Sequence, residues 1–195
     1  MRIKLFAVLL LISVNTYSQD YSFTELLPRD KDDKIYFSEV VTTDGLSKDV
    51  LYQNSRVFFA DVFKSSNNVI QLDDKENGIL IGKGFSNIYA KASVRDGIYI
   101  ILDFTATVQM WFSIKIQFKD GRYKYEIYDV YFIGNSEYAD NNKSYSGEYI
   151  FNKIRLTKKS STENLLKCKS AVENEIKTII SSLKTSLSVS KTNEF

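Results

Sequence analysis

Acidic side chains are the first candidates for chemistry, because the 195-residue sequence contains no histidine. The Ser-His, Cys-His and His-metal arrangements, which are the commonest in catalysis, are therefore excluded. Asp129 is the sharpest candidate, since the hairpin described below places it opposite Phe112 on an apolar face, where an unpaired charge is costly. A tyrosine or lysine partner, or a position beyond the edge of the core, would remove that cost. One hypothesis is therefore a carboxylate-dependent hydrolase of envelope substrates, centred on a possible buried acid at Asp129.

Three other patterns fail as chemical motifs. Ser181 and Lys184 have Ser-x-x-Lys spacing but lack the partner motifs of that class. The stretch 78–84 departs from a phosphate-binding loop in its spacing, and it lacks the required hydroxyl. The acids of 30–33 lack the glycine and glutamate that a calcium loop needs. The sequence thus predicts no metal site and no cofactor, and it favours a binding protein over an enzyme.

A β-hairpin is the strongest local prediction. Apolar residues alternate at spacing two from Ile98 to Phe118, and Asp120-Gly121 then forms a typical two-residue turn before a second alternating run. As one strand, the first run would be about 70 Å long, so a break is expected near 105–109.

Counting back from the turn puts Lys119 opposite Arg122 and predicts every later pair of the hairpin. The outer face then carries an aromatic patch away from the turn, made of Trp111, Tyr128, Val130 and Phe132. This patch supports a second hypothesis, a non-catalytic binding or adaptor module for an unknown protein or an apolar ligand. If the loop 134–152 or the final helix covers the patch, the reason for proposing a binding surface is lost.

The remaining elements predict one α+β domain over 34–187. Strands are expected at 35–41, 69–72, 79–81 and 85–96, and helices at 47–63 and, capped by Thr162, up to 187. A flexible leader precedes the domain at 19–33, and residues 188–195 are expected to fray.

Residues 1–18 have the anatomy of a signal peptide, with basic residues, a ten-residue apolar core and small residues at the cleavage point. The predicted product is periplasmic or secreted, with no membrane span after cleavage. Losing Arg2 and Lys4 lowers the basic residues from 26 to 24, which equals the 24 acids, so the mature chain is neutral. A neutral chain is a poor partner for nucleic acid. The lone Cys168 cannot form an internal disulfide and is expected to pack as a small apolar group.

Several motifs carry a resemblance to a known family. These are the stretches 45–48, 63–74, 82–84 and 119–125, which read GLSK, FKSSNNVIQLDD, GKG and KDGRYKY. Over about 35–132 the chain resembles the exported bacterial domain of unknown function with a TBP-like fold. The resemblance implies a curved antiparallel sheet of about five or six strands with two main helices on one face. It implies export in bacteria with a Gram-negative type of envelope, and it carries over no catalytic or binding residue.

Overall fold

The computed structural model describes residues 27–63, 69–96, 99–105, 107–133, 143–151 and 159–190. The predicted signal peptide lies outside these residues. The described strands are β1 (Phe37–Thr42), β2 (Ile70–Asp74), β3 (Ile79–Ile88), β4 (Ser93–Asp96), β5 (Tyr99–Asp103), β6 (Val108–Lys119), β7 (Arg122–Ile133) and β8 (Ser144–Ser146). The helices are α1 (Lys48–Phe63), α2 (Gly147–Ile150) and α3 (Lys159–Leu187).

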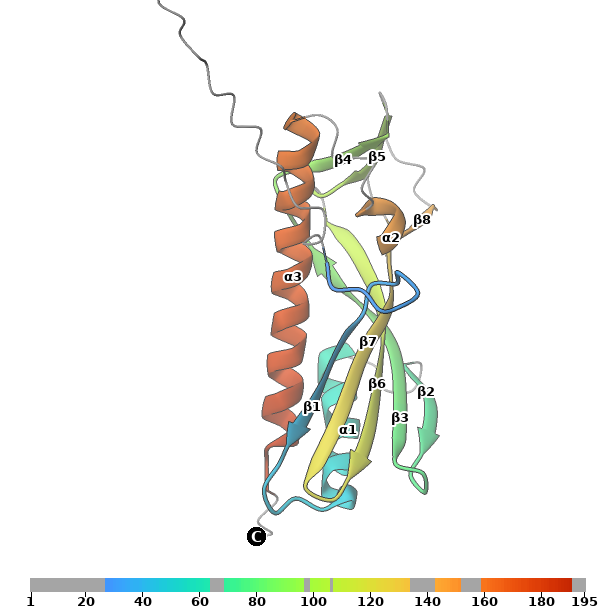
Figure 1. Ribbon diagram of the computed structural model, residues 1–195, viewed down its shortest axis with the longest axis vertical. Coiled ribbons are helices and arrows are strands. Elements are labelled where there is room, and N and C mark those ends of the chain that lie inside the picture. The colour runs from blue at the N-terminus through green and yellow to red at the C-terminus, as the bar shows by residue number, and fades with distance from the viewer. Residues whose placement is uncertain are drawn as a thin grey trace, which may run out of the picture.

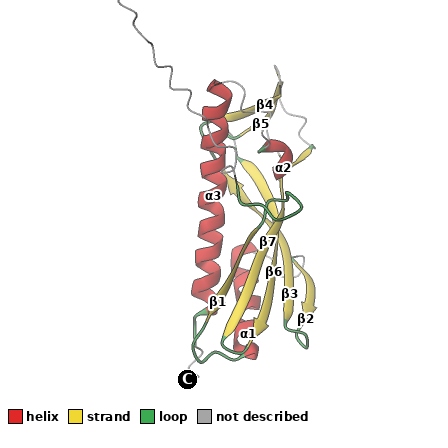
Figure 2. Ribbon diagram, in the orientation of Figure 1, coloured by secondary structure: helices red, strands yellow, loops and turns green. Residues whose placement is uncertain are grey.

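Six strands form the main antiparallel sheet, in the order β1-β7-β6-β3-β2 (Figures 1 and 2). Both β1 and β8 pair with β7, which has β6 on its other side. β1 pairs with residues 122–127 of β7, and β8 pairs with residues 131–133. The edge partner of β7 therefore changes along the strand, between residues 127 and 131.

The predicted hairpin is confirmed near its turn. Lys119 pairs with Arg122, and the pairing continues as predicted to Ser113 with Tyr128. Gly121 has a φ of 72°, a conformation that glycine adopts without strain. The predicted break is also confirmed, because β5 ends at Asp103 and β6 begins at Val108.

The two main helices pack on one face of the sheet, and this confirms the α+β expectation. Gly82 and Gly84 of β3 let α1 come close, since a Cβ atom at either glycine would clash with the Phe59 or Phe63 ring. Alternate residues of β6 point into the same core and are fully buried, from Val108 to Ile116.

The helix α3 carries the predicted apolar stripe, and Cys168 on it is buried as predicted. The helix begins at Lys159 rather than at the predicted cap, so Thr162 lies inside it and is buried. Its 29 residues correspond to a length of about 44 Å. This length allows α3 to pack against α1 and also against β4 (Figure 1).

The single strand predicted for 85–96 is divided between two sheets. β3 runs on to Ile88, and β4 pairs with β5 in a separate two-stranded sheet. Ala90, Ala92 and Val94 are buried. Their weak alternation therefore reflects packing beside the main sheet rather than membership of it.

Residues 27–33 of the predicted leader pack against the domain, and residues 19–26 lie outside the described part of the chain. Leu27 is buried, and Arg29 forms a β-bridge with Ile35 and donates a hydrogen bond to the carbonyl oxygen of Phe151. The Asp30 carboxylate accepts hydrogen bonds from two backbone N–H groups of its own turn, a common use of Asp in turns.

Two further observations concern the C-terminal tail and the helices. Within the predicted frayed tail, the carbonyl oxygen of Val189 accepts a hydrogen bond from the Asn54 side chain, and residues 191–195 lie outside the described residues. No helix within the described residues is long and apolar enough to cross a membrane.

Candidate functional site

A β-bulge in β7 organises the outer face of the sheet. Ser113 pairs with Tyr128, but Trp111 pairs with Tyr131, so Asp129 and Val130 together oppose Phe112. Asp129 has a φ of 53°, in the left-handed region. This conformation is typical of the first residue of one kind of bulge, where glycine is usual and Asp is among the residues that tolerate it best.

The bulge overturns half of the predicted aromatic patch. Beyond Asp129 the register is shifted by one residue, and such a slip exchanges the two faces of a strand. Phe132 therefore pairs with Met110 rather than with Gln109, and it points into the core. Val130 is only 2% exposed and Phe132 is fully buried, so their predicted place on the outer face is wrong. Trp111 and Tyr128 are half-buried on the outer face.

The prediction that Asp129 is a buried acid is also wrong, because its side chain is exposed. Its left-handed backbone turns the side chain out of the face that holds Phe112. The cost of burying a charge, which motivated the hydrolase hypothesis, therefore does not arise.

Sequence reasoning missed a row of aromatic rings, the aromatic ladder, formed by Phe85, Trp111 and Tyr131. The rings come from the adjacent strands β3, β6 and β7. The Trp111 and Tyr131 rings are stacked, with centroids 6.0 Å apart and planes within 10°. The Phe85 and Trp111 centroids are 4.9 Å apart, and Phe85 is 39% exposed. The consecutive apolar residues Val130, Tyr131 and Phe132 were the one sequence signal that simple alternation had ended.

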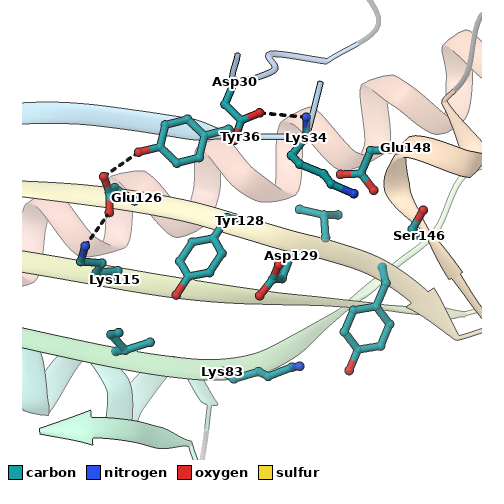
Figure 3. A pocket seen from close by; sticks show the side chains of 13 residues that line it. Asp30, Lys34, Tyr36, Lys83, Lys115, Glu126, Tyr128, Asp129, Ser146 and Glu148 are labelled. Carbon is teal, nitrogen blue, oxygen red and sulfur yellow. Dashed lines mark hydrogen bonds and ion pairs between the residues drawn. The ribbon is translucent and has the colours of Figure 1, made fainter. Parts of the chain in front are cut away.

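An open pocket of about 690 Å³ adjoins the ladder on this face, where β7 changes its edge partner from β1 to β8 (Figure 3). We call it the bulge pocket. Its lining comes from the turn before β1, from β3, β6 and β7, and from β8 and α2. The lining residues are Asp30, Lys34, Tyr36, Ile81, Lys83, Lys115, Glu126, Tyr128, Asp129, Val130, Tyr131, Ser146 and Glu148.

One wall of the bulge pocket is a fixed ion-pair network around Glu126. The Tyr36 hydroxyl donates a hydrogen bond of 2.6 Å to Glu126, Lys124 Nζ lies 2.5 Å from the carboxylate, and Lys115 Nζ lies 3.3 Å from it. Partial burial would raise the pKa of Glu126, but these donors outweigh it and lower the pKa to about 2. Glu126 is therefore ionised and held in place at neutral pH.

The other wall keeps its polar groups available. Within the part of the chain that the structure describes, Lys34 Nζ and the Asp129 carboxylate have no hydrogen-bond or ion-pair partner. Lys83 Nζ lies 5.2 Å from the centroid of the Tyr131 ring, a cation–π contact. Burial, together with the nearby negative charge of Asp129, raises the pKa of both Tyr128 and Tyr131. Both tyrosines are therefore neutral hydroxyl groups at physiological pH.

The Glu126 carboxylate is not prepared to act as a general acid. A general acid at neutral pH needs a raised pKa, whereas that of Glu126 is lowered. Among the described side chains, no group of three or more Asp, Glu or Cys residues is placed to hold a metal ion. The pocket thus offers a ligand donors, acceptors and an adjoining aromatic surface.

The fold and this open sheet face define an α+β domain of TBP-like architecture. Residues 37–132 match the family described as a domain of unknown function (DUF4468) with TBP-like fold. The chain therefore contains a domain of this family, as the sequence resemblance predicted.

Two solved structures share the fold. A DUF4468 family protein from Bacteroides ovatus is 15% identical, with a TM-score of 0.62, over 87% of this chain and 95% of that one. A TBP-like protein from Parabacteroides distasonis is 16% identical, with a TM-score of 0.54, over 82% and 98% of the two chains. No curated protein matches the sequence. At these identities the likeness concerns the fold alone, and fold does not carry function.

Proposed function

We propose that the protein is an exported, non-catalytic binding module whose ligand occupies the bulge pocket and lies on the aromatic ladder. The observation that carries the proposal is the pocket of about 690 Å³ on a sheet face opposite the two main helices, next to stacked rings. Pockets of this size with a few convergent polar groups are typical ligand sites. The signal-peptide pattern of residues 1–18 and the neutral mature chain support an envelope ligand rather than nucleic acid.

The single tryptophan of the chain makes the proposal testable, since Trp111 lies in the ladder. We expect a saturable change in Trp111 fluorescence when the mature protein is titrated with size-fractionated envelope extract. The Tyr131→Ala variant should lose this response. Tyr89→Ala, which removes an exposed tyrosine outside the ladder and the pocket, should keep it.

Mass spectrometry of the recovered ligand separates binding from catalysis. A binding module returns its ligand chemically unchanged. A product that forms with wild-type protein but not with Asp129→Asn would instead favour the carboxylate-dependent hydrolase. No fluorescence response from any fraction would overturn the binding proposal.

A further inference from the structure

We infer that the ligand of the bulge pocket is an uncharged oligosaccharide, an inference that rests on the proposed binding function. One sugar-ring face would lie on the aromatic ladder, and the hydroxyl groups would reach the polar wall of the pocket.

The ladder forms a continuous aromatic surface about as long as a sugar ring needs. The Trp111 and Tyr131 planes lie within 10° of parallel and stack on each other, the Phe85 ring is tilted by 38° from Trp111, and the row crosses three adjacent strands, which is about 10 Å. The face of an aromatic ring is electron-rich and attracts weakly positive hydrogen atoms. One face of a pyranose ring presents C–H groups, so it can pack on the exposed aromatic surface of the ladder without burying a hydroxyl.

The pocket beside the ladder has both kinds of hydrogen-bonding group that a polyol requires. A hydroxyl is at once a donor and an acceptor. Lys34 and Lys83 supply ammonium donors, Asp129 supplies a carboxylate acceptor, and the Tyr128 and Ser146 hydroxyls can serve in either role. A wholly apolar ligand would displace water from these groups and offer no hydrogen bonds in its place.

The charges of the pocket favour an uncharged ligand. Lys115 and Lys124 carry two positive charges, which balance the carboxylate of Glu126, which they contact, and that of Asp30, which accepts hydrogen bonds within its own turn. Two ammonium groups, of Lys34 and Lys83, then face two carboxylates, of Asp129 and Glu148, of which Glu148 accepts one backbone hydrogen bond. Neither a phosphate nor a cation finds an excess of opposite charge here.

The test is titration of the mature protein with maltohexaose, cellohexaose, xylohexaose and chitohexaose. Binding is measured by Trp111 fluorescence and by calorimetry. We expect saturable binding to at least one uncharged oligosaccharide. Tyr131→Ala and Asp129→Asn should each weaken it about tenfold. The matched control Tyr89→Ala should bind as the wild type does.

Because Tyr131 is half-buried, circular dichroism must show that its variant is folded, and Lys83→Gln provides a second test that leaves the rings in place. Lys83→Gln should also weaken binding. The inference is overturned if the fluorescence titrations of all three site variants match that of the wild type. It is also overturned if no saccharide changes the fluorescence.

Palmitate, an apolar probe, distinguishes failure of this inference from failure of the proposed function. If palmitate binds in a Tyr131-dependent way and no saccharide does, the site binds ligands but not sugars. If neither binds, the inference fails, and the titration with envelope extract decides whether the proposed function fails with it.

Discussion

Asp129 combines two roles that usually fall to different residues. Its left-handed backbone forms the bulge, where glycine would be the least strained choice. Its exposed carboxylate faces the bulge pocket, which glycine could not supply. The residue therefore accepts some backbone strain in exchange for a polar group at the site, a pattern found at functional positions.

Substitution of Asp129 should separate these roles. Asp129→Gly should match or exceed the wild type in free energy of unfolding, because glycine is unstrained at this φ. Asp129→Ala should be about 1 kcal/mol less stable than Asp129→Gly, because a Cβ atom is disfavoured there without the compensation of a short polar side chain. Urea denaturation of both variants and of Asp129→Asn measures the differences. Equal stability of the Ala and Gly variants would show that the bulge conformation is not strained.

Glu126 should make stability depend on acid pH. Its folded pKa of about 2 lies below the ordinary 4.5, so its contribution is complete above about pH 4.5 and is lost as the pH falls toward 2. Glu126→Gln should lower the free energy of unfolding by about 1 kcal/mol at pH 7, after allowance for solvent screening of the lysines. The difference from wild type should shrink with acid.

Denaturation curves from pH 7 to pH 3 test this expectation. Glu76→Gln, in the exposed turn between β2 and β3, is the control for loss of one negative charge. A Glu126→Gln deficit that stays constant over this range would contradict the lowered pKa.

Among the elements, the contact between α1 and β3 depends on having no side chain at Gly82. Gly82→Ala should cost about 1–3 kcal/mol, because the new Cβ atom overlaps the Phe59 ring. Phe59→Leu in the same chain should restore part of the loss, so the two changes should be non-additive. Thermal unfolding of the single and double variants measures the coupling, with Asn87→Ala on the same strand as a control. Additive effects would mean that the helix moves away without loss of packing.

The strands also show what the sequence could and could not predict. The β6–β7 hairpin was predictable, since Asp120-Gly121 fixes the turn and apolar alternation fixes the faces. The bulge was not, because a single Asp inside a strand carries no turn signal of its own. The turn and the apolar alternation placed Trp111 and Tyr128 on the correct face. The predicted patch left out Tyr131 and Phe85, because the faces on which they lie depend on register and on strand neighbours.

At the scale of the whole molecule, α3 links the main sheet with the small β4–β5 sheet. Local patterns predicted this helix and its apolar stripe, but not its second partner, because Ala90, Ala92 and Val94 give too weak an alternation to show which sheet they join. The periodicity of apolar residues does not show which distant element a strand or helix packs against.

Export is a prediction about the whole chain. Expression in a host with a bacterial envelope should yield a periplasmic or secreted product that begins at Gln19, since cleavage is expected after Ser18. N-terminal sequencing of the fractionated product measures this directly. Replacing two leucines of the apolar core with lysine should retain the full-length precursor in the cytoplasm. Uncleaved cytoplasmic wild type would contradict the prediction.

The extra residue of the β7 bulge shifts the inside–outside alternation of the strand by one position. Substitutions at position 129 alter only local strain and one polar group. Loss of the residue would instead exchange every side chain from Val130 onward between the two faces, with Tyr131 sent into the core and Phe132 into water. Among related chains, an insertion or deletion at this point therefore matters more than the identity of any single residue beyond it. A change of one position in length is enough to determine whether the outer face carries the ladder.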